Sequence, residues 1–138
     1  MMVASDAPLQ TLRIAAAIVV NAKGELLLVR KRGTRYFMQP GGKIEPGEPA
    51  REALAREIEE ELGARVVPSR LAYVTRVEIE AANEANTLID AELFRLTLDE
   101  RVEAAAEIAE AVWVAPGQAL TLELAPLTRE HVLPLTLD

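Results

Sequence analysis

Cysteine is absent from this 138-residue chain, and histidine occurs once, as His131. Without cysteine the chain cannot form a disulfide, and a zinc or thiolate centre, which is built from Cys and His ligands, is not expected. The same absence fits a reducing compartment, so we expect a cytoplasmic protein.

Long hydrophobic runs are also missing, although 50% of the residues are hydrophobic. The longest apolar run, from Ile14 to Val20, is far shorter than the roughly 20 residues that cross a bilayer. It follows Arg13 and does not resemble the start of a signal peptide. We therefore expect no membrane association and no export.

Positive charge is in the minority, with 15 Lys and Arg against 22 Asp and Glu and a net charge of −7. Broad binding to nucleic-acid backbones depends on clustered Lys and Arg, so we expect a small-molecule partner and no nucleic-acid polymer. The densest basic cluster is Arg30, Lys31, Arg32 and Arg35. Arg30 and Arg32 are candidate phosphate contacts, and the competing interpretation is a charged strand end that resists aggregation.

The length suits a single domain. We expect a loose N-terminal segment over residues 1–10 and one domain over residues 11–138. Aromatic residues, which are the natural stacking partners of a nucleobase, are few, and each is more often a core residue than a ligand contact. The candidates are Tyr36, Phe37, Tyr73, Phe94 and Trp113.

The segment from Gly42 to Ala64 reads GKIEPGEPAREALAREIEEELGA and predicts an amphipathic helix. Pro49 suits the first helical position, so the helix should begin near Glu48, after a turn-rich loop that contains the glycines. Gly63 can adopt the left-handed conformation that ends a helix. The apolar stripe consists of Ala50, Leu54, Ile58 and Leu62.

Three carboxylates, those of Glu57, Glu60 and Glu61, fall on one flank of this helix, while Arg56 falls on the opposite, wetter side. Acids at these spacings repel each other by roughly 0.2–0.5 kcal/mol per pair on an exposed helix. A divalent cation relieves that repulsion, and hard carboxylate oxygens suit Mg²⁺ or Mn²⁺. Such an ion would neutralise a diphosphate and activate a bound water. The competing interpretation is a solvated acidic helix.

The spacing of this segment resembles the signature of the Nudix hydrolases, Gly-x5-Glu-x7-Arg-Glu-U-x-Glu-Glu-x-Gly-U, where U is a bulky aliphatic residue. Every glycine and charged position agrees, and only Ala64 is smaller than the pattern asks. The resemblance implies an α/β fold, specifically a Nudix-type α/β/α sandwich with a mixed β-sheet. It also implies a Mg²⁺ or Mn²⁺ cofactor, and a homodimer is plausible.

The resemblance also implies roles for individual residues. Glu57, Glu60 and Glu61 match the metal ligands, and Glu57 matches the acid often discussed as the base that activates water. Glu48 and Arg56 match residues that orient the acids. The carbonyl of Gly41 or Gly42 can approach the metal, and Gly42 belongs to the expected substrate contacts.

Several members of this family use a further acid outside the signature. Glu107 is the candidate here, because it begins a Glu-rich segment that leads into a strand containing Trp113. The alternative is that Glu107 is a solvated loop acid. Glu103 and Glu110 are the next candidates.

The short chain most resembles the MutT-like group, which hydrolyses nucleoside triphosphates to monophosphate and pyrophosphate. The proline typical of ADP-ribose pyrophosphatases and the tyrosine typical of diadenosine-polyphosphate hydrolases are replaced by Ile79, Glu80, Ala81 and Ala82. The late asparagine with which some MutT-like enzymes read an oxidised guanine is not identifiable. An ADP-ribose or nucleotide-sugar pyrophosphatase and a nucleotide-sensing module without catalysis are the alternatives.

The remaining elements follow from local patterns. A hairpin is expected from Leu12–Val20 and Glu25–Arg30 around a turn at residues 21–24. Pro116-Gly117 marks a turn. Later strands are expected at Arg65–Glu80, Thr87–Leu98 and Val112–Val114, and short helices at Gln118–Leu124 and Thr128–Leu133.

Overall fold

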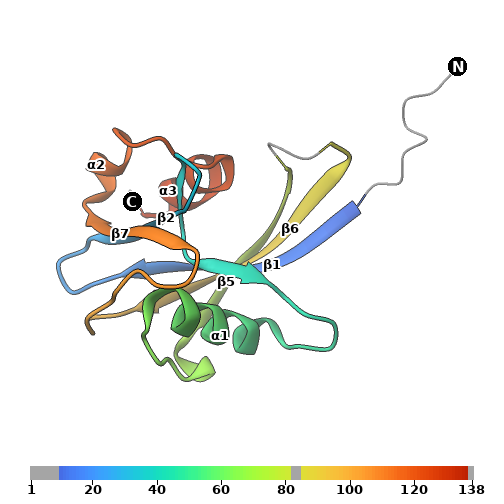
Figure 1. The fold of residues 1–138 in the computed structure, drawn as a ribbon, viewed down its shortest axis with the longest axis horizontal. Coiled ribbons are helices and arrows are strands. Elements are labelled where there is room, and N and C mark those ends of the chain that lie inside the picture. Colours follow the sequence, from blue (N-terminus) through green and yellow to red (C-terminus); the bar gives the residue numbers. More distant parts are fainter. Residues whose placement is uncertain (1–9, 82–84, 137–138) are drawn as a thin grey trace, which may run out of the picture.

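The chain folds as one mixed β-sheet between helical layers. The structure is a computed structural model that describes residues 10–81 and 85–136, so residues 1–9 of the expected N-terminal segment lie outside it. Figure 1 shows helix α1 on one side of the sheet and helices α2 and α3 on the other. The strand order is β3-β2-β1-β6-β5, with β4 paired to β1 and β7 paired to β2. The expected α/β/α sandwich is confirmed.

The strands and helices have the following bounds. The strands are β1 Gln10–Val20, β2 Leu26–Lys31, β3 Phe37–Met38, β4 Gly41–Lys43, β5 Ala72–Glu80, β6 Thr87–Thr97 and β7 Ile108–Val114. The helices are α1 Ala50–Leu62, the 3₁₀ turn η2 Pro68–Arg70, α2 Pro116–Ala119, the π-helical turn η3 Thr128–Val132 and α3 Leu133–Thr136. Among the described residues, no helix is long and apolar enough to cross a membrane.

The predicted hairpin of β1 and β2 is confirmed, and its turn is held by Asn21. The Asn21 side-chain oxygen accepts hydrogen bonds from the backbone N–H groups of Lys23 and Glu25. The two strands pair only at Val20 and Leu26 and then separate. Beyond that point β1 pairs with β4, and β2 pairs with β7. The separation therefore brings β4 against β1, next to the start of α1.

The segment from Gly41 to Lys43 was expected to be part of a loop, and that expectation is wrong, because β4 forms there. Gly41 pairs with Ala16, and its φ is 154°. A Cβ atom on Gly41 would lie 2.2 Å from the carbonyl oxygen of Ala15, so only glycine allows the backbones to approach this closely. Glycine here permits strand pairing as well as turning.

Two further boundaries differ from the sequence-based prediction because of proline. Pro68 begins the turn η2, so β5 starts at Ala72 and not at Arg65. Pro116 occupies the first position of α2, where its missing N–H costs nothing, so this helix begins where only a turn was expected. Strand β7 is longer than predicted, and the final helical segment lies where it was expected.

Two hydrophobic clusters hold the layers together, one on each face of the sheet. Leu54, Ile58 and Leu62 of α1 pack against alternate residues of β1 and β6. Ala64 is buried in this cluster, so the small residue fits where the family pattern has a larger one. On the opposite face, the C-terminal segment contributes Leu124 and Val132.

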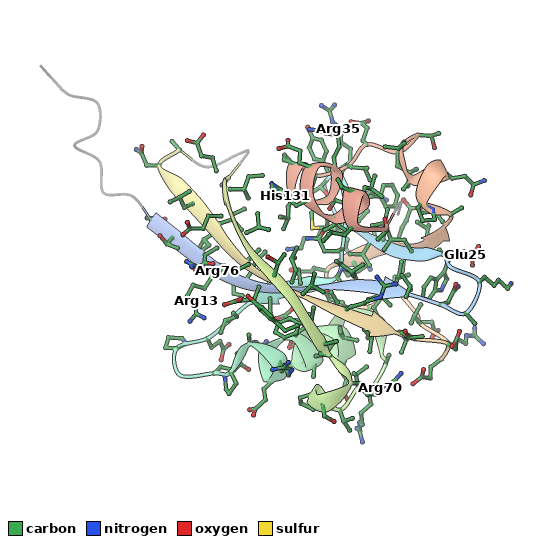
Figure 2. All side chains as sticks on the ribbon, turned by 180° about the vertical axis from the view of Figure 1, so that it is seen from behind. Arg13, Glu25, Arg35, Arg70, Arg76 and His131 are labelled. Carbon is green, nitrogen blue, oxygen red and sulfur yellow. The ribbon has the colours of Figure 1, made fainter. Side chains whose placement is uncertain are left out.

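Asp90 shows how this fold accommodates a buried charge. The Arg76 guanidinium donates to both carboxylate oxygens of Asp90, at 2.7 and 3.0 Å. Arg13 and Arg76, labelled in Figure 2, lie on β1 and β5, the two strands on either side of β6, which contains Asp90. Both arginines lower the pKa of Asp90, mainly through the hydrogen bonds from Arg76. Asp90 is thus a locally neutralised structural acid.

The close approach at Gly41 gives a test by mutation. Gly41→Ala should destabilise the protein by about 1–3 kcal/mol, because the new methyl group overlaps the backbone of β1. Gly117→Ala is the matched control, since a Cβ atom there meets nothing within 4 Å. Urea unfolding measures both variants, and equal stabilities would refute the proposed backbone constraint.

Candidate active site

Helix α1 contains three of the acidic residues of the signature, and they differ in how deeply they are buried. Pro49 was predicted at the first helical position, with the helix beginning near Glu48, but Pro49 is the extended N-cap residue and the helix begins at Ala50. Gly63 has φ 71° and donates its N–H to the carbonyl of Glu59, which ends the helix as predicted. Glu61 is buried, with 2% of its surface exposed, whereas Glu57 is half-buried and Glu60 is exposed. The three glutamates therefore lie on the predicted flank, with Glu57 and Glu61 nearer the core than Glu60. Glu61 is, however, more deeply buried than its helical position indicated.

An acidic recess of about 380 Å³ lies beside these residues, and we call it the acid recess. Its lining residues are Glu57, Glu60, Glu61, Ala106 and Glu107. The structure thus brings together the three glutamates predicted as metal ligands and the predicted additional acid, whereas Gly41, the fourth predicted ligand, does not line the recess.

Glu107 reaches the recess because its loop is tied to the end of α1. The backbone N–H of Glu103 donates to the Leu62 carbonyl at 3.0 Å, and that of Ala105 donates to the Glu61 carbonyl at 2.9 Å. Ala106 then takes a left-handed conformation, with φ 54°. A non-glycine residue in this region costs roughly 1–2 kcal/mol, so the surrounding bonds hold the loop in place.

The two other late acids lie elsewhere. Glu103 does not line the recess, and Glu110 lies in β7, where it accepts a hydrogen bond from Arg30 at 2.8 Å. Of the three acids considered, only Glu107 faces the carboxylates of α1.

Arg56 binds the acids on both of its sides. Its guanidinium donates to Glu48 at 2.9 and 3.1 Å and to Glu57 at 2.8 Å. These bonds raise the pKa of Arg56, the largest contribution coming from Glu48, and they lower the pKa of Glu48. The helical position of Arg56 indicated the wetter side, and that prediction is wrong because the long side chain reaches back. Its orienting contact with Glu57 is the one that the family resemblance implies.

The diglycine of β4 contacts two of the acids through its backbone. The N–H of Gly41 donates to Glu61 Oε1 at 3.3 Å. A Cβ atom on Gly42 would lie 2.4 Å from the carboxyl carbon of Glu57, so glycine is required for this contact. Gly41 and Gly42 therefore support two of the acids that line the recess.

The charge balance of the recess is negative. Burial raises the pKa of Glu61 to about 8, and the charges of Glu57 and Glu107 add to this effect. Burial and the charge of Glu60 also raise the pKa of Glu57. Unlike Asp90, Glu61 has no arginine against its carboxylate among the residues that the structure describes. A backbone N–H and the more distant Lys31 oppose the increase in its pKa.

An oxygen-only donor set with unbalanced negative charge fits Mg²⁺ or Mn²⁺. Within residues 10–81 and 85–136, no three acids converge into a ready-made cation cage. Glu57 is turned towards Arg56, and Glu61 towards Gly41. Magnesium usually takes only one or two protein carboxylates and completes its shell with water and phosphate oxygens, so a partly assembled donor set is compatible with it.

Some residues of the predicted basic cluster lie beside the recess, and others do not. Lys31 Nζ lies 3.5 Å from Glu107 Oε1, and the backbone N–H of Arg32 donates to the Glu107 carbonyl at 2.8 Å. Arg32 Nε is 3.4 Å from the Ala106 carbonyl. Of the two predicted phosphate contacts, Arg32 therefore lies beside the recess, whereas Arg30 is bound to Glu110. Sequence reasoning did not select Lys31, although it belongs to the same basic cluster.

A second, mainly apolar cavity of about 410 Å³ lies on the opposite face of the sheet, and we call it the apolar cavity. Its walls combine three sheet isoleucines, the segment before β4 and the C-terminal helical segment. The lining residues are Ile14, Thr34, Tyr36, Met38, Gln39, Ile79, Glu80, Ala81, Ile89, Leu124, Ala125, Pro126, Leu127 and Arg129. Of the five aromatic candidates, only Tyr36 lines it. Apolar residues from distant strands carry no local signal, so the sequence did not predict this cavity.

Known proteins identify the family. The chain matches the NUDIX domain over residues 10–135. It belongs to the Nudix hydrolase family. This membership confirms the resemblance noted in the sequence and the expected enzyme class, a Nudix hydrolase.

Individual Nudix relatives cover most of the chain. A putative 8-oxo-dGTP diphosphatase of Bacillus subtilis (strain 168) is 29% identical over 119 residues, which are 86% of this chain and 75% of that protein. The 8-oxo-dGTP diphosphatase of Escherichia coli (strain K12) is 31% identical over 84 residues, or 58% of this chain and 64% of that protein. The matches thus span between about two thirds and three quarters of these two relatives.

Solved structures agree with the fold. The E. coli ORF135 protein has a TM-score of 0.70 at 29% identity, with 93% of this chain and 87% of that chain covered. The MutT protein from Methanosarcina mazei Go1 has a TM-score of 0.76 at 26% identity, with 92% and 93% covered.

The buried carboxylate of Glu61 gives the second prediction. In the metal-free protein its pKa rises from 4.5 to about 8 on folding, so between these pH values the folded chain holds a proton that the unfolded chain releases. Stability from this group is therefore present below pH 4.5 and is lost as the pH rises towards 8. Glu61→Gln should stabilise the metal-free protein by about 1–3 kcal/mol at pH 8 and have little effect near pH 4.5.

The same variant should respond differently to metal. Saturating Mn²⁺ should raise the Tm of the unmodified protein and leave that of Glu61→Gln nearly unchanged, because a ligand stabilises only the state that binds it. Glu59→Gln, altered on the exposed side of α1, is the control and should keep the shift. A full Mn²⁺ shift in Glu61→Gln would contradict the assignment of Glu61 as a ligand.

Proposed function

We propose that this Nudix hydrolase cleaves a diphosphate linkage in a nucleoside diphosphate linked to another group, and that its substrate is a (deoxy)nucleoside triphosphate, converted to monophosphate and pyrophosphate. The observation that carries this proposal is the position of the segment Gln39 to Gly42. Gln39 lines the apolar cavity, whereas Gly41 and Gly42 contact Glu61 and Glu57 of the acid recess. One short segment thus borders a cavity suited to a nucleobase and a recess suited to a metal-bound phosphate chain.

The dimensions suit a single nucleotide. Two residues of extended chain span at most about 7 Å, so Gln39 and Gly41 are close enough for one ligand to contact both regions. Tyr36 supplies an aromatic face to the apolar cavity. Lys31 and Arg32 stand at the recess, where positive charge attracts phosphate oxygens.

The residues that would hold Mg²⁺ or Mn²⁺ are Glu57, Glu60 and Glu61, with the Gly41 carbonyl. When bound, the ion neutralises phosphate oxygens and makes a coordinated water more acidic. Glu57, held by Arg56 and Gly42, is placed to accept the proton of the attacking water, and its raised pKa favours that task at neutral pH. Water attacks phosphorus, the new P–O bond forms, and the bond to the pyrophosphate leaving group breaks.

The relatives support a nucleoside triphosphate. The B. subtilis and E. coli proteins carry the name 8-oxo-dGTP diphosphatase, and we infer a substrate of that class for this chain. RNA pyrophosphohydrolases, such as that of Pectobacterium carotovorum subsp. carotovorum (strain PC1), are 36% identical over only 59 residues, or 43% of this chain. A net charge of −7 also disfavours a nucleic-acid polymer as substrate. A cytoplasmic location and a homodimer stay predictions.

A substrate panel tests the function. Phosphate and pyrophosphate release is measured from nucleoside triphosphates, including 8-oxo-dGTP, from ADP-ribose, from nucleotide sugars and from dinucleoside polyphosphates, with and without Mg²⁺ or Mn²⁺. We expect metal-dependent pyrophosphate release from triphosphates. Preferred cleavage of ADP-ribose or a nucleotide sugar would establish the alternative enzyme instead, and tight nucleotide binding without turnover of any compound would indicate the sensing module.

Glu107 has its own prediction, because only this late acid lines the recess. Glu107→Gln should lower kcat by about 10- to 100-fold, since the acid then no longer assists proton transfer or metal binding. Glu103→Gln, four residues earlier in the same tied loop, is the matched control and should keep near-normal kcat. Equal rates for the two variants would return Glu107 to the role of a solvated loop acid.

A further inference from the structure

A buried polar pair, Gln39 and Thr128, lies at the apolar cavity. Gln39 is 6% exposed and Thr128 is completely buried. The Thr128 hydroxyl donates to Gln39 Oε1 at 2.6 Å. Among residues 10–81 and 85–136, this is the only side-chain hydrogen bond with both partners buried. It joins the segment before β4 to η3, and neither the acid recess nor the proposed hydrolysis uses it.

This hydrogen bond fixes the direction of the Gln39 amide. In the described part of the chain, the Thr128 hydroxyl has no other acceptor. Turning the amide around would therefore leave a buried hydroxyl hydrogen without a partner, which is unfavourable. The amide oxygen is thus occupied, and the amide nitrogen is directed away from Thr128.

The amide nitrogen of Gln39 is assigned to the cavity by elimination. It donates to no described residue, yet no described side-chain nitrogen or oxygen is both fully enclosed and without a partner. The nitrogen must therefore retain access to open space, and Gln39 lines the apolar cavity. A mostly apolar cavity with one oriented N–H₂ group can recognise a hydrogen-bond acceptor on an otherwise apolar, planar ligand.

We propose that Gln39 selects purines with an oxo group at C6 and pyrimidines with an oxo group at C4, and that Thr128 is its positioning residue. This inference rests on the proposed function, because it assigns the base of the nucleotide to the apolar cavity. Guanine O6 and thymine O4 are acceptors, whereas adenine N6 and cytosine N4 are donors. A freely turning glutamine could serve both classes, but the oriented amide offers only donors. Guanine and thymine nucleotides therefore bind better than adenine and cytosine nucleotides.

The test measures binding, so that it does not depend on turnover. Isothermal titration calorimetry with Mg²⁺ gives the Kd of dGMP, dTMP, dAMP and dCMP. An unpaired buried donor is costly enough to predict roughly 10- to 100-fold weaker binding of dAMP than of dGMP, and of dCMP than of dTMP. Gln39→Leu removes the donor and should reduce both ratios to within about threefold of unity.

The role of Thr128 is tested by a pair of variants. Thr128→Val releases the amide, which can then turn to face either base class, so both ratios should fall while binding persists. Thr128→Ser keeps the hydroxyl and should preserve the ratios. Thr121→Val, at an exposed threonine, is the control and should match the unmodified protein. Thermal unfolding confirms that each variant is folded, and unchanged ratios in a folded Thr128→Val would overturn the positioning role of Thr128.

The possible results separate this inference from the proposed function. Equal affinity for the four nucleotides, no nucleotide binding at all, or a preference that Gln39→Leu leaves unchanged would each overturn the role of Gln39. Metal-dependent triphosphate hydrolysis in the substrate panel would still support the function in those cases. Conversely, a dGMP preference that depends on Gln39, without turnover of any triphosphate, would uphold the inference and refute the hydrolytic proposal.

Discussion

The burial of the Glu61 carboxylate at the end of α1 is the constraint on which the site depends. A buried carboxylate is unfavourable unless hydrogen bonds or positive charge compensate it. Asp90 obtains that compensation from Arg76, whereas Glu61 has one long hydrogen bond from the Gly41 backbone. The fold thus maintains a region of unbalanced negative charge next to β4. A divalent cation with a phosphate chain is the chemical partner that such a region accommodates best.

The surrounding structure keeps the acids in place without neutralising them completely. Gly42 allows the Glu57 carboxylate to lie against the backbone of β4, and Arg56 holds that carboxylate from the other side. The loop before β7 is bonded to the last turn of α1, and this brings Glu107 to the same recess. Each contact comes from a different part of the chain, so the arrangement exists only in the folded protein.

Local sequence patterns were sufficient for the helix and the acids, because their information is contained within one segment. Pro49, Gly63 and the apolar stripe specify α1, and the spacing of the glutamates specifies one flank. The depth of Glu61 and the strand at Gly41 depend on β1, which is distant in sequence. Arg56 reaches back to Glu48 within the same segment, a contact that its helical position alone did not indicate. The apolar cavity was not predicted for the same reason, since Ile14, Ile79 and Ile89 meet only when the sheet forms.

The two faces of the sheet therefore have separate tasks in this account, with chemistry at α1 and base recognition beside the C-terminal segment. A crystal structure with Mn²⁺ and a non-hydrolysable dGTP analogue tests this division most directly. The account predicts anomalous scattering from Mn²⁺ among Glu57, Glu60 and Glu61, with the guanine in the apolar cavity and its O6 at the Gln39 amide. Manganese bound elsewhere, or a base outside the apolar cavity, would contradict it.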